Sequence, residues 1–98
     1  MYMYAKTYKT QKHFMVAACD KELIGQTLKN EACEIKVSAS FYQGEEVTED
    51  VLEDLLMRAT TANLIGQKAV ACAIKCEIID PSSVIYFGEI PHALYFAL

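Results

Sequence analysis

The chain has 98 residues, 53% of them hydrophobic, and a formal net charge of −4 at pH 7. An acidic chain lacks the large positive footprint of a stand-alone nucleic-acid-binding protein, and no apolar run reaches the roughly 18 residues of a membrane-spanning helix. The length fits a single domain over residues 1–98, and the absence of a signal-peptide pattern at the N-terminus predicts a cytoplasmic protein with reduced cysteines.

The first third of the chain has the pattern of a β-hairpin. Residues 2–8 alternate, with tyrosine and lysine on one face and small or apolar side chains on the other. Residues 13–19 form a second, mostly apolar run, and the polar residues 10–12 lie between the two. We therefore expect two antiparallel strands joined by a turn.

A less regular segment follows the hairpin. Asp20 is expected to cap a short helical turn through its carboxylate. A weak alternation over residues 33–37 predicts a third strand, and residues 38–44 read as a loop. That loop is expected to bury one of its two aromatic rings, Phe41 or Tyr42.

The middle of the chain has helical periodicity. Thr48 is placed to cap a helix, because two carboxylates follow it in the first turn. Apolar residues then recur at three- and four-residue spacing over residues 51–62 and again over 69–76. The pattern predicts two helices, or one sharply bent helix, with a joint at residues 63–66. Asn63 is expected to cap the second helix.

The chain ends on two runs rich in β-branched and aromatic residues, 84–87 and 92–98, which flank Gly88-Glu89-Ile90-Pro91. This pattern predicts a strand, a turn and a second strand. The expected architecture is therefore α+β: a small antiparallel sheet formed by the N- and C-terminal hairpins, with two central helices packed on one face.

Four residues form a candidate binding site at a junction of helix and sheet. His92 would share a strand face with Leu94, Phe96 and Leu98, which favours a core position, but it also follows a turn at the rim of the sheet. A histidine there could act as a general base. Asn63 and Gly66 could serve as structural caps, or expose N–H groups that hold an anion. The candidate set is Tyr42, Asn63, Gly66 and His92.

A second candidate surface is basic and partly aromatic. It could touch phosphates and stack a base, although lysines on an exposed strand also serve to block edge-to-edge pairing. The candidate nucleic-acid contacts are Lys6, Tyr8, Lys9, Lys12, His13 and Lys21.

The four cysteines do not predict a metal site. Cys72 and Cys76 would share a helix face, but the chain has no C-x-x-C pair. Free cysteine packs as a small hydrophobe, so core packing is the preferred interpretation. We expect no metal and no cofactor.

Several segments in order resemble the archaeal "domain of unknown function 424" family. They are Cys19-Asp20 with Glu22-Leu23-Ile24-Gly25, Val37-Ser38 with Phe41-Tyr42 and Gly44, Ala59-Thr60 with Ala62 to Gly66, and Pro91-His92-Ala93-Leu94. The resemblance covers nearly the whole chain and implies an archaeal cytoplasmic protein, but it supplies no activity. The chain departs from the family at Glu77, where such sequences tend to place glycine as the helix stop. Glu77 is therefore expected to occupy a left-handed position.

Charge is segregated along the chain: residues 1–30 carry a net +3 and residues 31–54 a net −7. This segregation, the apolar surplus and the absence of a coherent catalytic set favour a small non-enzymatic binding module. We expect a protein or ribonucleoprotein partner, in translation or RNA processing, and self-association stays open. The alternative is a small-ligand binder or enzyme with a pocket near Asn63, Gly66 and His92.

Overall fold

The computed structural model describes residues 2–97. Its strands are β1 (Met3–Lys9), β2 (Phe14–Asp20), β3 (Thr27–Lys29), β4 (Glu34–Lys36), β5 (Glu45–Val47), β6 (Thr61–Ile65), β7 (Ile85–Phe87) and β8 (Ile90–Phe96). Its α-helices are α1 (Ala39–Tyr42), α2 (Glu49–Arg58) and α3 (Gln67–Lys75), with short 3₁₀ turns at Lys21–Leu23 and Pro81–Ser83. The α+β architecture is as predicted.

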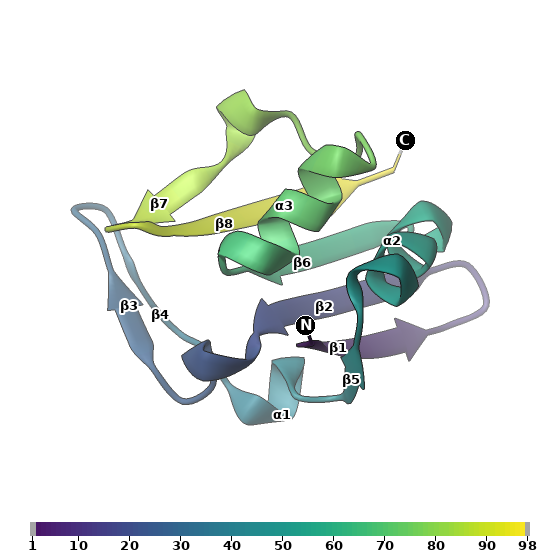
Figure 1. The fold of residues 1–98 in the computed structure, drawn as a ribbon, viewed down its shortest axis with the longest axis horizontal. Helices are drawn as coiled ribbons and strands as arrows, with labels where there is room; N and C mark the ends of the chain where they lie inside the picture. Colours follow the sequence, from purple (N-terminus) through teal and green to yellow (C-terminus); the bar gives the residue numbers. More distant parts are fainter. Residues whose placement is uncertain (1, 98) are drawn as a thin grey trace.

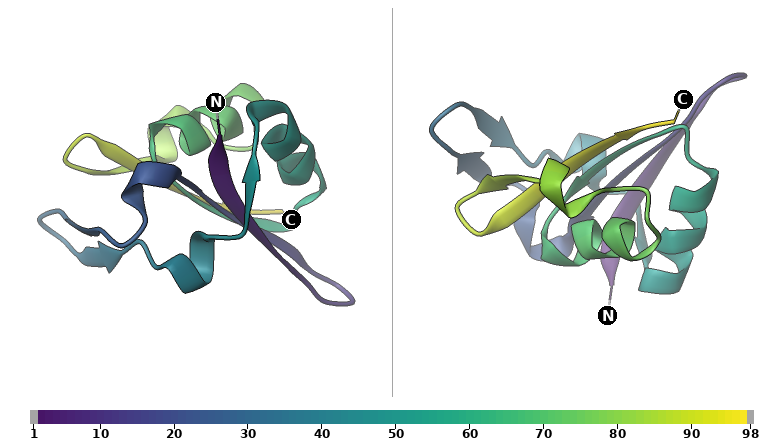
Figure 2. Two further views of the ribbon diagram at one scale, coloured as in Figure 1. Left: turned by 60° about the horizontal axis from the view of Figure 1, so that its bottom comes forward. Right: turned by 90° about the horizontal axis from the view of Figure 1, so that it is seen from above.

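Six strands form one sheet in the order β5-β1-β2-β6-β8-β7, and β3 and β4 form a separate hairpin (Figure 1). Helices α2 and α3 lie side by side on one face of the large sheet, whereas α1 and the β3–β4 hairpin lie on the opposite side (Figure 2). Both predicted hairpins are present, β1 with β2 and β7 with β8. The sheet is not wholly antiparallel, because its central pair, β2 and β6, runs parallel.

The predicted joint between two helices is wrong, because residues 61–65 form strand β6 in the middle of the sheet. This strand pairs with β2 on one side and with β8 on the other. Ala62 continues the three- and four-residue spacing of the preceding helix, which is why the pattern indicated a helix up to this point. Asn63 therefore does not cap the second helix, and Gly66 precedes α3 instead.

Asp20 also caps a different helix from the one predicted. Its side chain makes no hydrogen bond to the 3₁₀ turn that follows it. The backbone N–H groups of Lys68 and Ala69 donate to its two carboxylate oxygens at 3.1 and 2.9 Å. This buried carboxylate thus joins the end of β2 to the positive N-terminal end of α3.

Apolar side chains pack on both faces of the sheet. The cluster between the sheet and the helices includes Met3, Val16, Leu52, Leu56, Leu64 and Val70. A second cluster under the segment 21–44 contains Ala17, Cys19, Leu23, Val37, Tyr42 and Ile65. Tyr42 is thus the buried aromatic of the predicted loop, which contains the short helix α1. The predicted cap at Thr48 is present, since its hydroxyl accepts from the Val51 N–H.

Helix α3 ends in a left-handed residue that is not glycine. Glu77 has φ = 67°. This left-handed conformation was predicted because related sequences tend to place glycine at this position. The N–H of Glu77 donates to the carbonyl of Ile74 and that of Ile78 to the carbonyl of Ala73, at 3.0 and 3.1 Å. This pair of bonds is a Schellman motif, in which glycine is the favoured left-handed residue.

Candidate functional site

Three of the four candidate site residues meet at one oxygen atom. The Tyr42 hydroxyl donates to Asn63 Oδ1 at 2.6 Å, and His92 Nε2 lies 3.2 Å from the same oxygen. The residues come from α1, β6 and β8, and Asn63 and His92 lie on the sheet face opposite α2 and α3. We call these residues the Tyr42–Asn63–His92 cluster.

Burial sets the protonation of this cluster. It raises the pKa of Tyr42 to about 12, so the hydroxyl keeps its proton and donates it. It lowers the pKa of His92 below the ordinary 6.5, which favours the neutral ring. A neutral ring that donates from Nε2 leaves Nδ1 as an acceptor. Within residues 2–97, neither this Nδ1 nor the Asn63 amide nitrogen has a hydrogen-bond partner, so both can serve a bound molecule.

Gly66 lies apart from the cluster. Its N–H donates to the carbonyl of Pro91 at 2.9 Å, and a Cβ atom built on it would lie 2.4 Å from Cγ of Asp20. Gly66 therefore serves the contact between β2 and α3. It offers no group to a molecule at His92.

Next to the cluster, the sheet face is open. In the register of the sheet, Met15 lies opposite Thr61, Thr61 opposite Phe96, and Asn63 opposite Leu94. Leu94 is 49% exposed and Phe96 is 68% exposed. The segment 21–44 covers only the other end of this face. We call the surface formed by Met15, Thr61, Leu94 and Phe96 the open strip.

Sequence reasoning missed the open strip. Alternation along residues 90–96 shows that the strand has two faces, but both faces are apolar. Which of them is left uncovered depends on where α1 and the β3–β4 hairpin pack, and no local pattern reports that.

The candidate basic residues do not form one surface. The Lys6 ammonium donates to the carbonyl of Ser40 at 2.7 Å, and the Tyr8 hydroxyl donates to the carbonyl of Phe41 at 2.8 Å. The Tyr8 ring also stacks on the Phe41 ring, with centroids 5.7 Å apart. Lys9, Lys12 and His13 are exposed at the tip of the hairpin.

Lys21 lies at the opposite end of that hairpin, just after the end of β2, and forms an ion pair with Glu46. The six-residue nucleic-acid contact stays a prediction. Lys21 is separated from Lys9, Lys12 and His13 by the length of the strands, and its charge is balanced by Glu46.

The cysteines are dispersed. Cys19 and Cys72 are buried, Cys76 is half-buried and Cys33 is exposed. Burial raises the pKa of Cys72 to about 11, which keeps it a thiol. Across residues 2–97, no group of three side chains of the metal-binding types is close enough to hold an ion.

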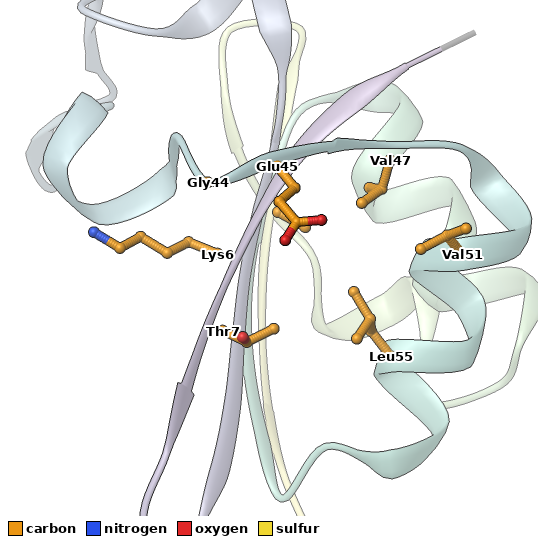
Figure 3. Close-up of a pocket in the computed structure, with 8 residues that line it drawn as sticks. Lys6, Thr7, Gly44, Glu45, Val47, Val51 and Leu55 are labelled. Atoms are coloured by element: carbon orange, nitrogen blue, oxygen red, sulfur yellow. The ribbon is translucent and has the colours of Figure 1, made fainter.

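Two surface cavities lie away from the Tyr42–Asn63–His92 cluster. One, of about 330 Å³, is lined by residues of β1, β5 and α2 (Figure 3). The other, of about 270 Å³, lies between α3 and the β7–β8 hairpin. Neither is lined by Tyr42, Asn63 or His92. No helix in the described part of the chain is long and apolar enough to span a membrane.

Comparison with known proteins gives a family and a fold. A family model described as "Protein of unknown function (DUF424)" matches residues 8–98. The crystal structure of an uncharacterized conserved protein from Methanopyrus kandleri superposes with a TM-score of 0.82 at 19% identity, over 100% of this chain and 93% of that chain. At this identity the likeness shows the shared fold alone. No curated protein matches the chain.

Proposed function

This chain belongs to the DUF424 family of proteins of unknown function, and from that premise we propose that it is a non-enzymatic module that binds single-stranded RNA on the open face of its sheet. One observation carries the proposal. Exposed apolar side chains, Leu94 and Phe96, lie on the same face as the partly unpaired polar groups of Asn63 and His92. Such a module would act in translation or RNA processing, as part of a ribonucleoprotein.

The chemistry of the face suits a nucleobase better than an extended protein surface. The Phe96 ring offers a stacking platform, which every base can use. The Asn63 amide nitrogen and the His92 Nδ1 offer one donor and one acceptor, the pairing that a base edge can match. Lys6 lies on this face of β1, and Lys12 lies at the hairpin tip beside it.

Stacking must supply most of the affinity, because few cations are free. Each phosphate contact to a single strand contributes about −0.7 to the salt slope of log K, so Lys6 and Lys12 give about −1.4 in total. A stacked base contributes about 1–3 kcal/mol. A binding mode dominated by stacking is compatible with the chain's net charge of −4.

The test is fluorescence anisotropy with a short fluorescein-labelled single-stranded RNA. Phe96→Ala is expected to weaken binding about tenfold, the loss of one stacked base. Tyr86→Ala is a matched control, since Tyr86 is 56% exposed but lies beside α3, on the other face of the sheet. Absence of binding by the natural protein, or equal losses in the two variants, would overturn the proposal.

A second candidate function is supported by the Tyr42–Asn63–His92 cluster itself. A small amide or carboxylic acid could bond to the free groups of Asn63 and His92 in place of a base. Neither of the two cavities described above lies at the cluster, which makes this candidate the weaker one. A screen of small amides that watches the His92 ring signals by NMR would test it, and unchanged signals would remove it.

A further inference from the structure

One edge of the large sheet is only partly paired. Strand β5 covers β1 from Met3 to Ala5 and no further. The chain reaches this edge at Gly44, the residue before β5, where a Cβ atom would lie 2.3 Å from the carbonyl oxygen of Ala5. From Thr7 to Lys9, β1 has no neighbouring strand on its outer side.

The hydrogen bonds of Phe14 show which backbone groups point outward. The N–H of Phe14 donates to the Thr60 hydroxyl oxygen, and its carbonyl accepts from the Thr60 N–H, both at 2.8 Å and both on the β6 side. Phe14 lies opposite Lys9 in the β1–β2 pair. Because both backbone groups of Phe14 point toward β6, Phe14 and Lys9 exchange no backbone hydrogen bonds. The N–H and C=O groups of Lys9, and of Thr7 two residues before it, therefore face the free edge.

The cavity of about 330 Å³ lies directly beside this free edge. Thr7 forms one wall, and Val51 and Leu55 of α2 form the apolar wall opposite (Figure 3). The Glu45 carboxylate points into the space between them (Figure 3). Within residues 2–97 no cationic group lies within ion-pair distance of Glu45.

We propose that the free edge of β1 and this cavity form a β-augmentation site for an extended segment of a partner protein, with a lysine or arginine opposite Thr7. An extended chain is the partner that unpaired N–H and C=O groups at a sheet edge select. Its side chain opposite Thr7 faces α2 and enters the cavity. An apolar stem then lies against Val51 and Leu55, and the cationic end meets Glu45.

A second copy of the chain fits this edge less well. The free edge is bounded by Gly44 at one end and by the hairpin turn at the other. Lys9 and Lys12 flank it, and lysines on an edge oppose pairing between identical strands. The site is also separate from the open strip, since it uses the outer edge of β1 and the face that carries α2.

The probe is a blocked peptide in which threonines alternate with two valines and a central arginine. Titration into ¹⁵N-labelled protein is expected to slow amide hydrogen exchange at Thr7 and Lys9 by about tenfold, as added strand hydrogen bonds do. The same peptide with glutamate in place of arginine is expected to give no protection. The edge amides of β3 serve as the internal control.

Three protein variants separate the contribution of the backbone from that of the cavity. Thr7→Pro removes the outward N–H, which no group in the fold uses, and is expected to abolish peptide binding while the fold is retained. Thr7→Val keeps that N–H and is expected to bind as the natural protein does. Glu45→Gln is expected to remove the preference for arginine over glutamate.

The proposal is overturned by absence of protection at Thr7 and Lys9 in excess peptide, or by equal binding of the glutamate peptide. It is also overturned if Thr7→Pro binds normally. Protection that depends on protein concentration without peptide, with a dimer in sedimentation, would identify a second copy as the occupant and reject the partner segment. These readouts do not involve RNA, so they are independent of the open strip.

Discussion

Gly66 lies so close to Asp20 that a Cβ atom built on it would be 2.5 Å from Asp20 Oδ1. The same carboxylate accepts two N–H groups from the first turn of α3. Gly66 also has φ = 112°, a conformation that side chains with a Cβ rarely adopt. The start of α3, the end of β2 and the end of β6 therefore depend on one glycine–carboxylate contact.

Gly66→Ala is expected to lower the free energy of unfolding by about 3 kcal/mol or more, because backbone strain and displacement of a buried carboxylate add together. Gly25→Ala is a matched control: Gly25 also has positive φ, 86°, but nothing lies within 4 Å of its Cβ position. It is expected to lose only the strain energy of about 1–2 kcal/mol, of which about 0.4–1 kcal/mol is offset because alanine has less freedom in the unfolded chain. Urea unfolding followed by circular dichroism measures both. Equal losses would show that the contact with Asp20 is unimportant.

Glu77→Gly is expected to stabilise the protein. A left-handed residue with a Cβ costs about 1–2 kcal/mol, and the greater freedom of glycine in the unfolded chain offsets about 0.4–1 kcal/mol of that gain. A net gain of about 0.5 kcal/mol corresponds to a rise in Tm of about 2–4 °C for a domain of this size. Thermal unfolding would detect it. An unchanged or lower Tm would mean that the Glu77 side chain makes a compensating contact in the folded state.

His92 is expected to make stability depend on pH. Burial lowers its folded-state pKa below the ordinary 6.5, so the unfolded chain takes up the proton first as the pH falls. Its contribution is complete above about pH 6.5 and is lost as the pH falls toward the folded-state pKa. His92→Gln cannot titrate and is expected to show a smaller loss of stability between pH 7.5 and pH 5 in urea unfolding. Identical pH profiles for the two proteins would contradict this prediction.

The four thiols are expected to react at different rates. Cys33 is exposed, whereas burial raises the pKa of Cys19 to about 12 and that of Cys72 to about 11. Since the thiolate is the reactive form, the folded protein should show one fast thiol with a disulfide reagent at pH 8. Cys33→Ser should remove that fast phase. More than one fast thiol in the natural protein would show that a buried segment opens readily.

Local patterns in the sequence identify most of the fold. The two hairpins, the Thr48 cap and the left-handed Glu77 all depend on neighbouring residues, and all are present. Strand β6 was missed because Ala62 satisfies the helical spacing that runs from Val51 to Ala59 as well as a buried strand position. What decides between them is pairing with β2 and β8, which are distant in the sequence.

The candidate site was also predicted only in part, because some of its contacts join residues that are distant in the sequence. Tyr42, Asn63 and His92 were selected for their functional groups, and the structure brings them together. The role assigned to Asn63 was wrong, however, because it depended on the missed strand. Asp20 was recognised as a capping residue, but its helix begins more than forty residues later, at a distance that local patterns do not span.

The parallel pairing of β2 with β6 bears on how the chain reaches its native state. Thr60 and Phe14, which bond to each other at the end of this pair, are 46 residues apart in the sequence. Each hairpin can form by itself within microseconds, but this pair must first close a long loop whose entropy opposes it. The two hairpins are therefore expected to exist as separate, fluctuating units until β6 joins them, and the rate of that single event should limit folding of the whole sheet.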